Sequence, residues 1–148
     1  MIPEIGQFSL AIALTLALVL GTLPIVGAAK DIPGFVAVAR PAAQGVFVFV
    51  AIAFACLVWL FVKNDFSVAY VASNSNSALP IEYRVAGVWG GHEGSLLLWV
   101  QMLAVWMLAV SVFSRNLPDE MVARILGVMG LVCIGFLLFM LIASNPFD

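Results

Sequence analysis

Residues 40–63 read RPAAQGVFVFVAIAFACLVWLFVK, and no charged residue stands between the first and the last position of this stretch. A helix that spans a membrane needs about 20 predominantly apolar residues. The stretch therefore predicts a transmembrane helix over residues 42–62. Trp59, close to the end of the stretch, is typical of the aromatic belt at a membrane interface.

Three further stretches of the chain are free of charge and long enough to span a membrane. Only 9% of the 148 residues are charged and 64% are hydrophobic, whereas soluble domains carry roughly 25% charged residues. The net charge of −2 offers no basic patch for nucleic acid. We therefore predict an all-α membrane protein with four transmembrane helices, over residues 5–28, 42–62, 95–114 and 123–144.

The distribution of Lys and Arg predicts the orientation of these helices, because cytoplasmic loops carry the excess of these residues. Segments 29–41 and 115–124 hold four of them, and the long segment 63–94 holds two, Lys63 and Arg84. We therefore expect both termini and segment 63–94 to lie outside the cytoplasm.

The predicted helices carry packing signals and little chemistry. Small residues recur every four positions in the first helix, at Ser9, Ala13, Ala17 and Gly21, a spacing that lets helices approach closely in lipid. Cys56 and Cys133 form no CxxC pair, and we interpret them as structural. No Asp, Glu, Lys, Arg or His lies in the interior of a predicted span, which argues against a transporter.

The unusual residues gather in the stretch 83–99, YRVAGVWGGHEGSLLLW. Glu93 and Ser95 suit the start of a helix, because they satisfy free backbone N–H groups. The only histidine, His92, either shapes the loop through a hydrogen bond or serves as a ligand. We predict no catalytic residue and no metal site. The candidate cofactor-binding residues are His92, Trp89 and Glu93, and the residues expected to shape the loop are Gly90, Gly91, Gly94, Ser95, Tyr83 and Arg84.

WGGHEGSLLLW, preceded by DFSVAYVASNSNSALPIEYRVAGVW, resembles the N-terminal part of the CcmF family. Further similar stretches run along the whole chain: MIPEIGQFSLAIAL, ARPAAQGVFVFVAIAF, LPDEMVARILGVMG and FMLIASNPF. That family is the membrane core of the haem lyase in bacterial System I cytochrome c maturation. The related nitrite-reductase assembly proteins share much of the pattern.

The resemblance implies a place in the bacterial inner membrane, with residues 63–94 on the periplasmic side. It also implies covalent attachment of haem to apocytochrome c at the outer face, and haem b in the complete protein. The implied partners are the rest of the lyase core, the haem chaperone, apocytochrome c, thiol-handling subunits and membrane lipid.

The family's tryptophan-rich WWD segment and its haem-ligating histidines lie beyond the part that matches, so the resemblance gives His92 no ligand role. We therefore expect residues 1–148 to be a single N-terminal bundle of a larger protein, either a fragment or one piece of a split protein. We expect no haem to be bound by this chain alone. The alternatives are a purely structural bundle that braces the catalytic portion and, less favoured, a transporter subunit.

Overall fold

The computed structural model describes residues 2–30, 32–63, 68, 71–72, 80–88, 92–114, 116–142 and 146–147. Within these residues, four helices are long and apolar enough to cross a membrane, and there is no strand. The four are α1 (Ile2–Lys30), α3 (Ala39–Val62), α6 (His92–Phe113) and α7 (Asp119–Ile142). The prediction of an all-α protein with four spans is confirmed. Two short helices, α2 (Pro33–Val36) and α5 (Ile81–Gly87), join them.

The helices extend past the charge-free stretches from which they were predicted. Helix α6 begins at His92 instead of residue 95, and α7 begins at Asp119 instead of residue 123. The reason is electrostatic, because the first turn of a helix favours carboxylates. Asp119 and Glu120 occupy the first turn of α7. The charged residues that were expected to precede this helix therefore belong to it.

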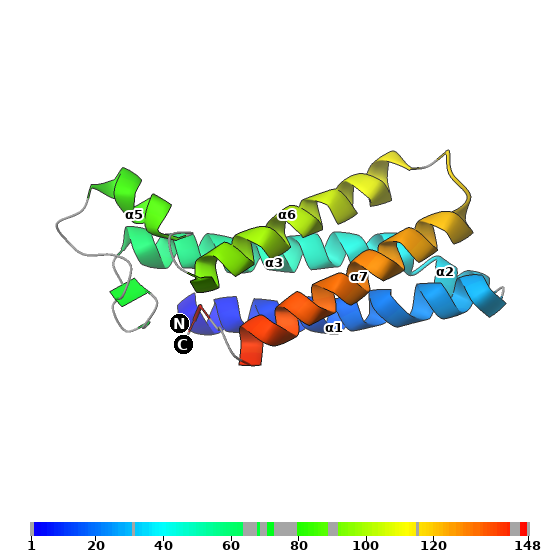
Figure 1. Cartoon of the computed structure of the whole chain (residues 1–148), viewed down its shortest axis with the longest axis horizontal. Coiled ribbons are helices and arrows are strands. Elements are labelled where there is room, and N and C mark those ends of the chain that lie inside the picture. Colours follow the sequence, from blue (N-terminus) through cyan, green and yellow to red (C-terminus); the bar gives the residue numbers. More distant parts are fainter. Residues whose placement is uncertain are drawn as a thin grey trace.

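Successive long helices run in opposite directions, and α6 and α7 are inclined to α1 and α3 (Figure 1). Helix α1 contacts α3 and α7 most closely, and α6 packs mainly on α3. Both chain termini, α5 and the start of α6 lie at one end, called here the N/C end. Helix α2 and the connection from α6 to α7 lie at the opposite end, called here the linker end. This arrangement agrees with the predicted alternation of the spans.

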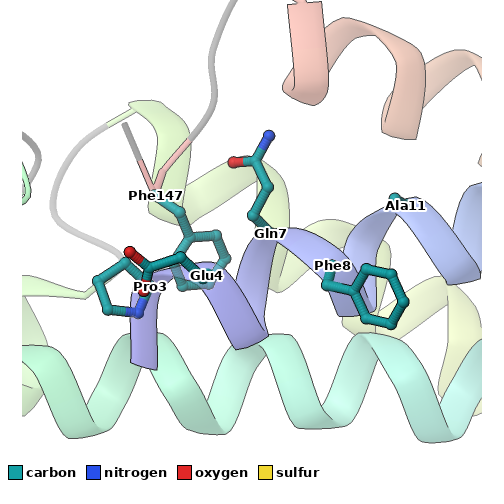
Figure 2. A pocket seen from close by; sticks show the side chains of 6 residues that line it. All are labelled: Pro3, Glu4, Gln7, Phe8, Ala11 and Phe147. Atoms are coloured by element: carbon teal, nitrogen blue, oxygen red, sulfur yellow. The ribbon is translucent and has the colours of Figure 1, made fainter. Parts of the chain in front are cut away.

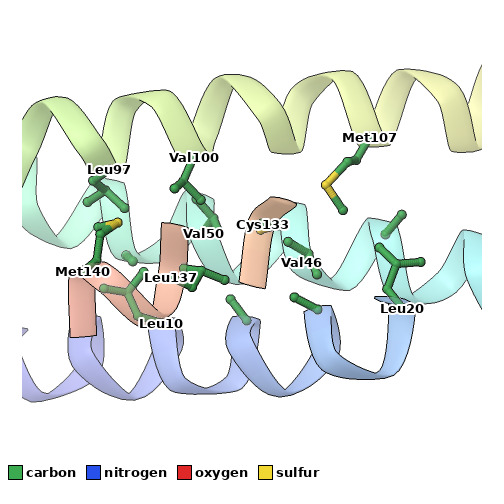
Figure 3. Packing of buried hydrophobic residues seen from close by; sticks show 14 of the residues in the cluster. Leu10, Leu20, Val46, Val50, Leu97, Val100, Met107, Cys133, Leu137 and Met140 are labelled. Atoms are coloured by element: carbon green, nitrogen blue, oxygen red, sulfur yellow. The ribbon is translucent and has the colours of Figure 1, made fainter. Parts of the chain in front are cut away.

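Apolar side chains from all four long helices meet in one core (Figure 3). Leu10 and Leu20 of α1 face Val46 and Val50 of α3 in this core, and all four side chains are fully buried. Helix α6 adds Leu97, Val100 and Met107, and α7 adds Cys133, Leu137 and Met140. The structural interpretation of Cys133 fits this position.

The predicted ladder of small residues is buried in α1 and brings α7 close. A Cβ atom added to Gly130 of α7 would lie 3.1 Å from the backbone nitrogen of Gly21, a member of the ladder. One added to Gly127 would lie 2.5 Å from Cγ1 of Ile25. The backbones of α1 and α7 therefore pack at a distance that only small residues allow.

Candidate functional site

Two of the residues predicted to shape a loop, Tyr83 and Arg84, lie in the short helix α5. Helix α5 contacts α3, and Val88, directly after it, is fully buried. Tyr83 and Ile81 are exposed. The helix is thus anchored at one end and presents an aromatic and an aliphatic side chain at the surface of the N/C end.

Gly94 and Ser95 were also predicted to shape a loop, and they lie in the first turn of α6. Gly94 is buried there. Trp89, Gly90 and Gly91 lie outside the described residues, as do the side chains of Arg84, His92 and Glu93. The roles of His92, Trp89 and Glu93 therefore stay predictions.

The end of the stretch 83–99 lines an apolar groove between α6 and α7. Ser95, Leu96 and Trp99 of α6 form it together with Phe136 of α7, and its volume is about 250 Å³. Nothing in the spacing of the last predicted span distinguished Phe136 from its apolar neighbours, so the sequence analysis missed it. The groove offers flat apolar and aromatic contacts with one hydroxyl group at its rim.

A second and larger hollow of about 490 Å³ opens at the start of α1. Pro3, Glu4, Gln7, Phe8 and Ala11 line it from α1, and Phe147 lines it from the C-terminal segment (Figure 2). The ring of Phe147 packs against Gly6, where a Cβ atom would collide with it. Glycine at position 6 thus lets the C-terminal segment close on α1. The hollow combines a carboxylate and an amide with aromatic walls.

Neither hollow offers the ligands of a metal or of haem. Among the described residues, no group of three His, Cys, Asp or Glu could hold a metal ion. Met107, Cys133 and Met140 are fully buried in the apolar core, and a haem iron needs an axial ligand such as His, Met or Cys beside an open pocket. Neither hollow is lined by a His, Met or Cys side chain.

A polar network lies at the opposite, linker end. Nη1 of Arg40 donates to the carbonyl of Ser111 at 2.7 Å, and Nη2 donates to the carbonyl of Ser114 at 3.2 Å. The carboxylate of Asp119 is 3.6 Å from Nη2. Nη2 of Arg124 donates to the carbonyl of Ala28 near the end of α1, at 3.5 Å. Both arginines therefore meet the carbonyl-rich ends of helices, where a cation is favoured.

The chain was compared with known proteins and structures. It is 58% identical over all 148 residues to the cytochrome c-type biogenesis protein CcmF of Pseudomonas aeruginosa, of which it covers 22%. It is 52% identical over its full length to CcmF of Escherichia coli (strain K12), of which it covers 23%. The resemblance to the CcmF family is confirmed. No family model matches the chain.

The cytochrome c-type biogenesis protein NrfE of Haemophilus influenzae is also similar, at 38% identity over 99% of this chain and 23% of its own length. The solved structure of Cytochrome c Heme Lyase CcmF matches the whole chain with a TM-score of 0.94 and 26% identity, over 25% of that structure's chain. The chain thus spans about a quarter or less of the CcmF proteins that it matches, and its four long helices have the CcmF arrangement.

Proposed function

We propose that this chain is the N-terminal membrane portion of a haem lyase for cytochrome c maturation. The observation that carries the proposal is the identity of 58% to a CcmF protein along the entire chain, together with the fold shared with Cytochrome c Heme Lyase CcmF. In this proposal the chain is multi-pass in the bacterial inner membrane, and its N/C end faces the periplasm.

At the N/C end, the chain would form one wall of the chamber where haem is joined to apocytochrome c. The exposed Tyr83 and the groove between Trp99 and Phe136 lie at this end. They would supply aromatic contacts. Haem b would be held by the rest of the lyase. The haem chaperone, apocytochrome c and the thiol-handling subunits would meet the assembled protein there.

Complementation tests this proposal. The full-length gene that contains this region is introduced into bacteria lacking their own haem lyase core, and covalent haem in c-type cytochromes is measured by peroxidase staining of denaturing gels. We expect restored staining. No staining at a normal level of membrane protein would overturn the proposed activity.

His92→Ala in the same strain tests the contribution of the stretch 83–95. We expect a modest loss of cytochrome c if His92 shapes the loop, because a side-chain hydrogen bond contributes about 0.5–1.5 kcal/mol. Complete loss at normal protein level would point to a direct role at haem. Staining equal to that of the wild type would remove His92 from the site.

A second candidate function is a bundle that only braces the catalytic portion. The completeness of the core and the close contact of α1 with α7 favour it. Variants in the stretch 83–95 separate the two functions. Bracing predicts that cytochrome c falls only in proportion to protein level, whereas a chamber wall predicts a fall at constant protein level.

A further inference from the structure

Gln101 is a polar residue in the middle of the transmembrane helix α6. It lies nine residues after His92, the start of the helix, which places it about 13 Å along the helix axis. Its Oε1 atom is buried and has no hydrogen-bond partner among the described residues. Lipid hydrocarbon contains no water to satisfy such an atom, so an amide at this depth needs a partner from protein.

The position of Gln101 on α6 shows which side the partner must approach. The fully buried Leu97, Val100 and Ala104 face the bundle. Leu96 and Trp99, on one flank of this stripe, meet Phe136 of α7. Gln101 lies on the other flank of this stripe. It is turned around the helix axis by about 100° from Val100 and by about 40° from Leu97, away from Leu96 and Trp99. The groove with Phe136 of α7 thus lies on the opposite flank of α6 from Gln101.

The flank that carries Gln101 continues as an open apolar edge. Val105 and Val112 follow it at the spacing of one helix face and are 48% and 36% exposed. Helix α3 presents its own exposed stripe through Val48 and Ile52. Gln44, one turn before Val48, reaches the hydroxyl of Ser111 in α6 at 3.5 Å, so this stripe borders α6. The exposed apolar side chains of these two neighbouring helices are called here the apolar strip, and Gln101 with its unsatisfied oxygen lies on the flank of α6 that carries Val105 and Val112.

We propose that a further transmembrane helix of the longer polypeptide packs along this strip, and that the amide of Gln101 turns outward to hydrogen-bond a Ser, Thr, Asn or Gln side chain of that helix. The inference rests on the proposed function, in which this chain is about a quarter of a CcmF-like protein. The matched CcmF relatives are more than four times as long as this chain, so they contain additional segments that can supply the helix. Polar side chains join transmembrane helices in this way. Lipid acyl chains have no group that can bond an amide.

Thermal denaturation of the detergent-purified full-length protein tests the hydrogen bond through the direction in which Gln101→Leu shifts the melting midpoint. If the amide is bonded across helices, Gln101→Leu lowers the melting midpoint. If the amide faces lipid, Gln101→Leu raises the midpoint or leaves it unchanged, and the proposal fails. Thr15→Val is the matched control, because the hydroxyl of Thr15 already bonds the carbonyl of Ala11 in its own helix at 3.0 Å. We expect almost no shift in this control.

Photo-cross-linking identifies the occupant even if the leucine variant does not fold. Benzoylphenylalanine replaces Val105 in the full-length protein, and cross-linked peptides are mapped by mass spectrometry after irradiation in membranes. The proposal expects a peptide from a later transmembrane segment of the same polypeptide. Cross-links to lipid, to a second copy, to the outer segment 63–91, or to nothing would overturn it. Haem staining in the complementation strain is scored separately, so failure of the proposed lyase function is distinguishable from failure of this contact.

Discussion

Arg40 joins three elements at the linker end through one planar guanidinium group. Arg40 lies in the first turn of α3. Its guanidinium group donates to two carbonyls at the end of α6 and approaches Asp119 at the start of α7. Hydrogen bonds from a charged group are worth about 1.5–3 kcal/mol, and partial exposure to solvent reduces this value. We expect Arg40→Ala to lower the free energy of unfolding by about 1–2 kcal/mol, measured by unfolding in SDS from detergent micelles. Arg40→Lys should restore only part of the loss, because an ammonium group cannot span both carbonyls.

Arg124→Ala is the control for the variants of Arg40. Its one described hydrogen bond is 3.5 Å long, so we expect a smaller loss than for Arg40→Ala. Asp119→Asn should change little, because the Asp119 side chain is 81% exposed and exposed ion pairs contribute about 0–1 kcal/mol. Equal losses for the two arginine variants would contradict the assigned role of Arg40.

The role of Arg40 could not be predicted from the sequence. Counting positive charges placed Arg40 at one side of the membrane, but its partner Ser111 is 71 positions away. Which helix ends meet depends on the packing of whole helices, and local spacing carries no information about it. Gln101 was missed for a related reason, because an uncharged amide does not interrupt a charge-free stretch. Its significance appears only when its burial is known.

At the scale of elements, the contact of α1 with α7 depends on glycine. A Cβ atom at Gly127 would lie 2.5 Å from Cγ1 and 2.8 Å from Cδ1 of Ile25. Overpacking of this kind costs about 1–3 kcal/mol. We expect Gly127→Ala to lower the free energy of unfolding by that amount in the SDS assay.

Gly135 in the same helix is the matched control. A Cβ atom there meets nothing within 4 Å among the described residues, and the position is exposed. Alanine is the better helix former by roughly 1 kcal/mol, so Gly135→Ala should be neutral or slightly stabilising. Equal losses of stability in the two variants would contradict the assignment of the cost at Gly127 to the α1–α7 contact.

The elements themselves were largely predictable, because each span is a long charge-free stretch and the ladder from Ser9 to Gly21 indicated close packing. The ladder did not reveal its partner. Only the fold shows that Gly130 of α7 meets Gly21 of the ladder, and that Gly127 of α7 meets Ile25 one turn further along α1. The helix starts were less predictable, since charged residues in the first turn of α7 belong to the helix. The short helix α5 was missed because seven residues give no clear periodicity.

At the scale of the whole molecule, the strongly exposed side of α6 carries Trp99, Met102, Trp106 and Phe113. A soluble protein would bury such a face, whereas a membrane protein can turn it to lipid or to further helices. The bundle is therefore complete in its core and open at its perimeter. This combination agrees with a chain that spans about a quarter or less of its CcmF relatives. Sequence alone predicted the number and alternation of the spans. Which side chains stay exposed around the bundle could be seen only in the structure.

The orientation of the bundle in the membrane gives the last prediction. The segments at the linker end hold four Lys and Arg residues against two in segment 63–94, so the linker end should face the cytoplasm. Two exposed positions at opposite ends, Glu82 in α5 and Asn116 before α7, are replaced one at a time by cysteine, in a background of Cys56→Ala and Cys133→Ala. A membrane-impermeant maleimide should label the Glu82→Cys variant in intact spheroplasts. It should label the Asn116→Cys variant only after the membrane is broken. The reverse pattern would place the N/C end in the cytoplasm, where apocytochrome c on the outer face could not reach it.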